Sequence, residues 1–226
     1  AFLVACMALA LLPAAALADT PAQAQWGVAG SNGSAPTEWV NSGTLADAMT
    51  YANGAVGDTA YIQLQSDVTT TGPPEFASGK TTILDLNSWK IDRGLTGIVT
   101  DGHVIVVRGT LTLKDGSTED VASQGSITGG YNSNGTGGGV YILGGNFTMQ
   151  GGNITGNKNT SGFAGGGGVL VSSGSFAMQG GSIAGNEAKN WGGGICVPAA
   201  GSVTITGGSI TGNKSVNGGI YFGASS

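Results

Sequence analysis

The stretch GGGVYILGGNFTMQGGNITGN, residues 137–157, decides the fold of this chain. It recurs as GGGVLVSSGSFAMQGGSIAGN at 166–186 and as GGGICVPAAGSVTITGGSITGN at 192–213. A partial copy, GGIYFGASS, occupies 218–226. A period of this length indicates one supersecondary unit stacked repeatedly on itself.

Each unit contains three short apolar segments separated by Gly and Asn. Side chains alternate sides along a strand, so equivalent inward positions form columns from unit to unit. Five inward columns are expected: Val140, Val169, Ile195 and Ile220; Ile142, Val171, Val197 and Phe222; Phe147, Phe176 and Val203; Met149, Met178 and Ile205; Ile154, Ile183 and Ile210. One unit cannot bury these residues alone, whereas stacked units share a continuous core.

The sequence therefore predicts an all-β fold, a right-handed, single-stranded parallel β-helix with a short N-terminal capping helix. Ile127 lies 27 residues before Ile154, which indicates an older, degraded unit ahead of the clean ones. A flat antiparallel meander is the alternative, but it needs hairpin turns rather than a constant three-strand unit.

Three zones follow from this pattern. We expect a signal peptide at 1–18, a leader and N-terminal cap at 19–57, and the β-helix at 58–226, with clean repeats at 137–226. The last repeat stops part-way through a unit, so further rungs are expected beyond it. Open strand edges are normally covered in natural solenoids.

Residues 1–18 are uncharged, rich in Leu and Ala, and end in Ala-Leu-Ala before Asp19. This ending fits a signal-peptidase site. A transmembrane helix and lipoprotein processing at Cys6 are the alternatives. Pro13 weakens the first, and the apolar residues that follow Cys6 weaken the second. No other segment is apolar enough to span a membrane, so the mature chain is expected to be exported without a membrane span.

A helix is expected at about 44–53. Thr44 is a suitable N-cap, with Asp47 three residues later. Leu45, Ala48, Met49 and Ala52 fall on one face, which can cover the open end of the solenoid.

Composition narrows the function. Of 44 glycines, 34 lie beyond residue 100, and only 9% of residues are charged while 40% are hydrophobic. That balance excludes simple disorder. A net charge of −5 argues against nucleic acid as a partner. Two cysteines cannot make a disulfide framework.

The units resemble the repeats of bacterial cell-surface parallel β-helix proteins of the pectin-lyase-like superfamily. Those repeats combine a glycine triplet, Val-Tyr-Val, Gly-x-Phe-Thr-Met and Gly-Gly-x-Ile-x-Gly-Asn. The stretches YIQLQSDVTTTG and SGKTTILDLNSWKI also resemble the first coils of that family, so the resemblance covers residues 44–226. It implies a large secreted or wall-anchored protein that is adhesin-like.

Catalysis in such folds uses clustered carboxylates. Residues 121–226 contain one acid, Glu187, and the cations Lys158, Lys189 and Lys214. An acidic patch precedes them and includes Asp85, Asp92, Arg93, Asp101, His103, Arg108, Asp115, Glu119 and Asp120. Solvated strand faces and turns are the simpler interpretation of this patch. A polysaccharide-active enzyme that uses the acids between Asp85 and Asp120 is the alternative function.

No cofactor and no metal site is predicted. His103 is the only histidine and is expected at a strand edge. Cys196 lies between two inward residues and is expected to point outward as an inert thiol, because no cationic neighbour is close in sequence.

An outward column is the more informative feature. Tyr141, Leu170, Cys196 and Tyr221 are predicted to form an apolar stripe, extended by the loop residues Phe163 and Trp191. We interpret Tyr141, Leu170, Trp191 and Tyr221 as a possible contact for sugar rings or a partner protein. Singly exposed aromatic residues, or a stripe covered by another part of the protein, are the simpler interpretations.

Asn157, Asn186 and Asn213 recur after glycine. Asn tolerates left-handed turns and can hydrogen-bond to its copy in the next rung, so a structural ladder is expected. Together these features predict an exported surface protein, structural or adhesin-like, that presents a binding face to a glycan or to a host or neighbour-cell surface protein.

Overall fold

The computed structural model describes residues 22–116, 120–163, 165–198 and 200–223. Strands arranged in three sheets account for most of its regular structure, consistent with an all-β solenoid. The expected signal peptide, the continuation beyond residue 226 and Glu119 of the acidic patch lie outside the described residues. Within the described residues, no helix combines the length and the apolar composition that crossing a membrane requires.

The largest sheet has twelve strands. They are β1 (Ala24–Val28), β2 (Asn41–Gly43), β3 (Thr59–Leu64), β5 (Glu75–Phe76), β6 (Thr81–Asp85), β8 (Ile105–Val107), β9 (Thr110–Lys114), β12 (Val140–Met149), β15 (Val169–Met178), β18 (Ile195–Val197), β19 (Ala200–Ile205) and β21 (Ile220–Phe222).

Two smaller sheets accompany the large one, and the smaller of them has a strand in three rungs only. The six-stranded sheet contains β4 (Val68–Thr69), β7 (Lys90–Asp92), β10 (Ser126–Thr128), β13 (Asn153–Thr155), β16 (Ser182–Ala184) and β20 (Ser209–Thr211). The three-stranded sheet contains β11 (Tyr131–Asn132), β14 (Lys158–Asn159) and β17 (Glu187–Ala188). Two short 3₁₀ turns, Ser31–Gly33 and Val121–Ser123, lie between strands.

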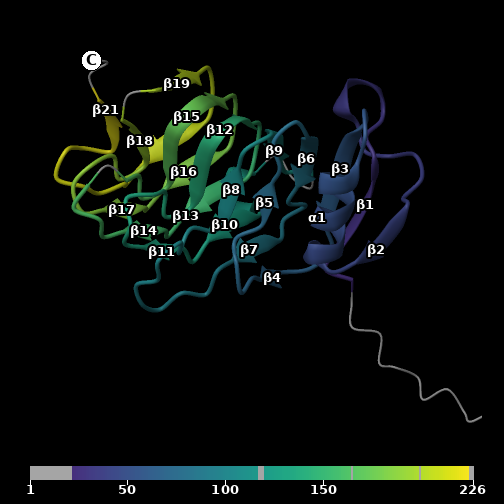
Figure 1. Ribbon diagram of the computed structural model, residues 1–226, viewed down its shortest axis with the longest axis horizontal. Helices are drawn as coiled ribbons and strands as arrows, with labels where there is room; N and C mark the ends of the chain where they lie inside the picture. The colour runs from purple at the N-terminus through teal and green to yellow at the C-terminus, as the bar shows by residue number, and fades with distance from the viewer. Residues whose placement is uncertain (1–21, 117–119, 164, 199, 224–226) are drawn as a thin grey trace, which may run out of the picture.

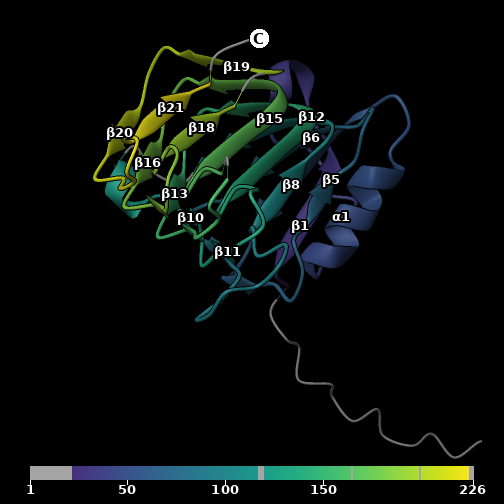
Figure 2. The ribbon, with the colours of Figure 1, turned by 60° about the vertical axis from the view of Figure 1, so that its left-hand side comes forward.

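Successive repeats pair in parallel and in register. Val140 pairs with Val169, and Ile154 pairs with Ile183, as equivalent positions of neighbouring units. Strands of one sheet therefore lie side by side from the α1 end of the stack to β20 and β21 (Figure 2). The antiparallel meander is thus wrong for the repeats. In the described part of the chain, only β1 pairs antiparallel, with β2 and β3.

The inward columns form the core. Val140, Val169 and Ile195 are fully buried, and the rings of Phe147 and Phe176 stack with centroids 5.2 Å apart and planes 12° apart. Burial declines in the last rung, where Ile205 is 45% exposed and therefore lacks the covering that its column mates have. The columns predicted from alternation are confirmed except at Ile205 and Phe222, which is 59% exposed, while Val203, Ile210 and Ile220 are partly buried against the core.

The helix α1 (Leu45–Gly54) lies beside β1 and β3 at the opposite end of the stack (Figure 1). The Thr44 hydroxyl accepts a hydrogen bond from the Asp47 amide, and the Asp47 carboxylate accepts one from the Thr44 amide. This reciprocal capping box begins the helix. The buried residues of α1 are Leu45, Ala48, Met49 and Ala52, as the pattern predicts.

Two details of the repeat differ from expectation. In the first two clean units, the first two predicted strands are one bent strand, β12 or β15, whose pairing is irregular between Ile142 and Asn146, whereas in the third unit they are separate strands, β18 and β19, as predicted. Gly144 and Gly174 occupy this bend with φ of 82° and 89°, a conformation that glycine adopts without steric cost. The strands of the three-stranded sheet were not predicted, because two-residue strands carry too little alternation to be detected.

We expect Phe147→Ala to lower the free energy of unfolding by about 3–5 kcal/mol, since it opens a cavity against Phe176 in the shared core. Thr148→Ala on the same strand faces outward and is the matched control, with an expected change within about 0.5 kcal/mol. Urea denaturation measures both. Equal effects of the two substitutions would contradict the assigned faces.

Candidate functional site

The predicted outward stripe is a real column of register partners. Tyr141 pairs with Leu170, Leu170 with Cys196, and Cys196 with Tyr221, and Val106 extends the column on the other side of Tyr141. None of these residues belongs to the central hydrophobic core. Strand alternation therefore places all of them on the outer face of the large sheet, as expected.

The middle of this outer column is buried, which corrects the expectation of a continuous exposed stripe. Leu170 is 2% exposed and Cys196 is 0% exposed. The segment before each strand folds back over it: a Cβ on Gly166 would lie 2.0 Å from the Val169 carbonyl oxygen and 3.2 Å from the Leu170 amide nitrogen. The first glycine of each triplet thus permits close contact between the main chains of loop and strand.

Cys196 is correspondingly inert. Its burial raises the pKa of the thiol to about 11, against a smaller opposing effect of a backbone hydrogen bond from Gly165. A thiol with this pKa is almost wholly un-ionised near neutral pH, and the thiolate is the nucleophile. The structure therefore provides no reactive cysteine at this position.

Aromatic side chains on either side of Leu170 and Cys196 remain partly accessible, namely Tyr141, Trp191 and Tyr221. Trp191 and Tyr221 are half-buried, and their ring centroids lie 4.4 Å apart at 55°. Tyr141 contacts His103, with centroids 5.6 Å apart. Phe163 is 83% exposed, and its ring contacts no other aromatic ring of the described residues. The predicted stripe is therefore interrupted, because the buried Leu170 and Cys196 separate Tyr141 from the Trp191–Tyr221 pair.

His103 is buried rather than placed at an open strand edge. It precedes β8, is 4% exposed, and its Nδ1 lies 3.4 Å from both Asn132 Nδ2 and Thr136 Oγ1. Burial is the main cause that lowers the pKa of His103 below its ordinary value. The ring is thus part of a polar network inside the loops, and Tyr141 packs against it with the ring planes tilted by 59°.

The three repeated asparagines are joined by side-chain hydrogen bonds. Asn157 Nδ2 donates to Asn186 Oδ1 at 3.1 Å, and Asn186 Nδ2 donates to Asn213 Oδ1 at 3.0 Å. Their remaining amide hydrogens bind the carbonyl oxygens of Ile127, Ile154 and Ile183 at 3.1, 2.8 and 2.7 Å, respectively. Asn157 and Asn186 are fully buried, so their amides serve the scaffold.

The ladder begins where the degraded unit ends. Gly130 stands 27 residues before Asn157 and has no side chain, but its amide donates to Asn157 Oδ1 at 3.0 Å. Each asparagine follows a glycine with positive φ, namely Gly156, Gly185 and Gly212 at 67°, 63° and 61°. These glycines turn the chain so that each asparagine carboxamide points into the stack, where it can reach the neighbouring rungs.

Asp85 is the first acid of the predicted acidic patch. It lies outside the core but is 2% exposed. Its carboxylate accepts hydrogen bonds from Tyr61 Oη at 2.9 Å, Gln63 Nε2 at 3.1 Å and the amides of Asn87 and Gly116 at 3.1 and 2.9 Å. Burial first, and the Asp85 charge second, raise the pKa of Tyr61. Asp85 therefore anchors the loop at Gly116 to the sheet.

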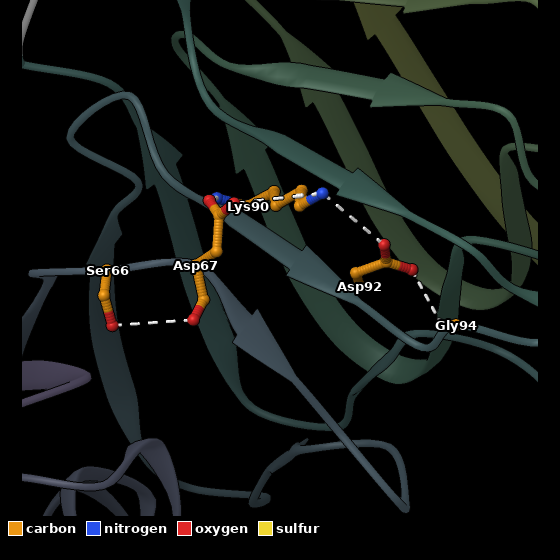
Figure 3. A network of polar contacts seen from close by, with 5 residues as sticks. All are labelled: Ser66, Asp67, Lys90, Asp92 and Gly94. Carbon is orange, nitrogen blue, oxygen red and sulfur yellow. Dashed lines mark hydrogen bonds and ion pairs between the residues drawn. The ribbon is translucent and has the colours of Figure 1, made fainter. Parts of the chain in front are cut away.

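The other acids serve separate turns. Asp115 accepts hydrogen bonds from the amides of Ser88 and Gly125, and Asp101 accepts one from Asn134 Nδ2 at 2.8 Å. Asp67 and Asp92 flank the Lys90 ammonium at 3.8 Å each (Figure 3). Among the described residues, no three His, Cys, Asp or Glu side chains gather closely enough to hold a metal ion.

Arg93 and Arg108, the two arginines of the patch, are also engaged. Arg93 is 7% exposed, and it donates to the carbonyl oxygens of His103 and Thr70 at 3.0 Å each. Arg108 pairs with Glu75 at 2.9 Å. The acidic patch is thus a set of loop anchors and surface ion pairs.

One polar groove was not predicted. It lies over the three-stranded sheet, has a volume of about 210 Å³, and is lined by Tyr131, Lys158, Asn159, Thr160, Glu187 and Lys189. We call it the lysine groove. Its signal in the sequence was the position of each charge just after the Gly-Asn turn of a repeat, as in Gly156-Asn157-Lys158 and Gly185-Asn186-Glu187.

Comparison of the chain with protein-family models, with curated proteins and with solved structures found no match.

We expect Asn186→Ala to lower the free energy of unfolding by about 3 kcal/mol, because it leaves the Asn157 side chain and main-chain amide without their buried acceptor. Asn217→Ala is the matched control, since that side chain is exposed, and its expected effect is within about 0.5 kcal/mol. Thermal and urea unfolding measure the difference. Indistinguishable stabilities would show that the ladder contributes nothing.

Proposed function

We propose that this chain is an exported bacterial surface protein, structural or adhesin-like, whose fold is a right-handed parallel β-helix. The apolar segment at 1–18 supports export. The parallel, in-register pairing of the repeats supports the helix, because parallel strands of one sheet are almost always connected by right-handed crossovers. A stack of this kind is a rigid support for an outward-facing binding surface.

The Trp191–Tyr221 pair is the observation that carries a binding role. Both rings are half-buried. The strand that follows Trp191, β18, pairs in parallel register with β21, which contains Tyr221. Trp and Tyr combine an apolar face with a polar edge, and they are enriched at binding interfaces for that reason. A sugar ring or an apolar side chain of a partner protein can stack on such a preformed pair.

The polysaccharide-active enzyme is the weaker alternative. A glycosidase needs two carboxyl groups that flank one bond, with one of them free to donate a proton. Asp85 instead accepts four hydrogen bonds inside the fold, and Asp101 and Asp115 belong to different turns. This distribution favours binding over catalysis.

We expect the full chain to bind glycans or a protein ligand on intact host or neighbour cells, and Trp191→Ala with Tyr221→Ala to weaken that binding about tenfold or more. A glycan array and a cell-binding assay measure it. Trp89→Ala is the matched control, since Trp89 is 38% exposed and lies outside the outer column.

Circular dichroism must show that the double variant is folded. Binding that is unchanged in a folded double variant, or lost equally in Trp89→Ala, would contradict the assigned face. Turnover of pectin or a glycosaminoglycan by the purified chain would instead support the enzyme.

A further inference from the structure

Four asparagines are followed directly by glycine, and the fold restrains them to different degrees. In such a pair, the main-chain nitrogen of the glycine can attack the side-chain carbonyl carbon of the asparagine, because glycine has no Cβ to crowd the approach. The attack is favoured when the carboxamide is free to move and the glycine N–H has no other acceptor. The four pairs are Asn32–Gly33, Asn53–Gly54, Asn134–Gly135 and Asn217–Gly218.

Two of the pairs lie in helical turns that engage one of the reacting groups. In α1, the Asn53 side chain donates to the Glu75 carbonyl oxygen at 2.9 Å and accepts from the Ala77 amide at 3.0 Å. In the 3₁₀ turn that follows β1, the Gly33 amide donates to the Gly30 carbonyl oxygen at 3.1 Å. Neither pair therefore has both groups free.

Asn134 is exposed, but both ends of its carboxamide are held. Its Nδ2 donates to Asp101 Oδ1 at 2.8 Å, and its Oδ1 accepts from the Thr136 hydroxyl at 2.9 Å. These two bonds keep the side-chain carbonyl carbon away from the following main-chain nitrogen. Exposure alone therefore does not decide which pair can react.

Asn217 differs from the other three. Its side chain is exposed and forms no hydrogen bond with the described residues, and the Gly218 amide has no acceptor among them. The main chain around the pair is nevertheless fixed. The Asn217 amide donates to the Asn190 carbonyl oxygen at 2.9 Å, and the Gly218 carbonyl oxygen accepts from the Ser215 hydroxyl at 2.6 Å and the Gly193 amide at 3.1 Å. Both reacting groups are thus unengaged within a turn that the neighbouring rung holds in place.

We propose that Asn217 is a site of spontaneous covalent modification, at which the main chain cyclises and reopens as aspartate or isoaspartate. The Gly218 nitrogen forms a bond to the Asn217 side-chain carbonyl carbon. The carbon–nitrogen bond of the carboxamide breaks, and its nitrogen leaves as ammonia with the proton lost from the Gly218 amide. Water then adds to one of the two carbonyl carbons of the ring: opening at the side-chain carbonyl gives aspartate, and opening at the main-chain carbonyl gives isoaspartate. One water is consumed and one ammonia is released, with no change of oxidation state.

Isoaspartate lengthens the main chain by one carbon atom directly before the strand β21, which lies beside β18 (Figure 2). The Gly219 carbonyl oxygen accepts hydrogen bonds from the amides of Gly194 and Ile195 at 2.7 and 3.1 Å. An added carbon displaces this acceptor from its donors, so we expect the modification to loosen β21 from β18. The inference goes beyond the proposed function, because the reaction needs no binding partner.

The test is peptide mapping by mass spectrometry of the full chain, incubated in its folded state in a mildly alkaline buffer. We expect Asn217 to be converted about tenfold or more faster than each of the other three asparagines. Electron-transfer fragmentation distinguishes isoaspartate from aspartate in the peptide. The same chain unfolded in urea is the control, since all four pairs should then react at comparable rates.

Variants at the same position test the chemistry and its structural consequence. Asn217→Gln keeps a carboxamide but must form a larger ring, and we expect it to remain unmodified. Asn217→Asp carries the charge of the products on a main chain of ordinary length, so it is the matched control for the isoaspartate form, isolated by chromatography. Hydrogen exchange of the β18 and β21 amides is expected to be faster in the isoaspartate form than in Asn217→Asp.

The inference is overturned if Asn217 stays unmodified in the folded chain, or if Asn53 or Asn134 reacts there at the same rate. Equal hydrogen exchange in the isoaspartate form and in Asn217→Asp would contradict the assigned effect on β21.

Discussion

Parallel register between neighbouring rungs is the constraint on which the rest of this structure depends. Because each residue stands beside its counterpart in the next repeat, any property of one rung is multiplied along the stack. Phe147 meets Phe176, Met149 pairs with Met178, and Asn157 bonds to Asn186. A shift of one residue would turn the apolar columns outward and the outer column inward. The repeats therefore stabilise one register and oppose the others.

The same register lets the buried asparagine side chains form hydrogen bonds with one another. A carboxamide has two donor hydrogens and an acceptor oxygen, and burying it without partners is costly. In this stack, Asn186 donates to the rung on each side and accepts from Asn157 twice, through the side chain and the main chain. A single asparagine could not be satisfied in this way. The ladder is thus a consequence of repetition, and its first position is taken over by the amide of Gly130.

Alternation within the repeats predicted the large features of the fold. The inward columns, the capping box at Thr44 and the outward direction of Cys196 all follow from local rules about strands and helix ends. Local rules could not predict that Leu170 and Cys196 are buried, because alternation gives the direction of a side chain and not what packs against it. The lysine groove was not predicted, for a similar reason. Strands of two residues show no alternation, and Lys158, Glu187 and Lys214 become neighbours only when the rungs stack. The inward residues of a rung can thus be predicted from one repeat alone. The side chains that meet on its outer surface depend on how neighbouring repeats stack.

This division also shapes the function that we propose. The scaffold uses glycine, asparagine and apolar residues, including the stacked Phe147 and Phe176, whereas the charged, Tyr and Trp side chains of the clean repeats lie outside the central core. The most direct test of the account is disulfide cross-linking between Thr155→Cys and Ala184→Cys, register partners on β13 and β16. Their Cα atoms are about 4.8 Å apart, within the range that a disulfide spans, whereas Thr155→Cys and Thr211→Cys are two rungs apart. Peptide mass spectrometry after mild oxidation should find the 155–184 bond and no 155–211 bond; absence of the first, or equal yields of both, would contradict the parallel, in-register stack.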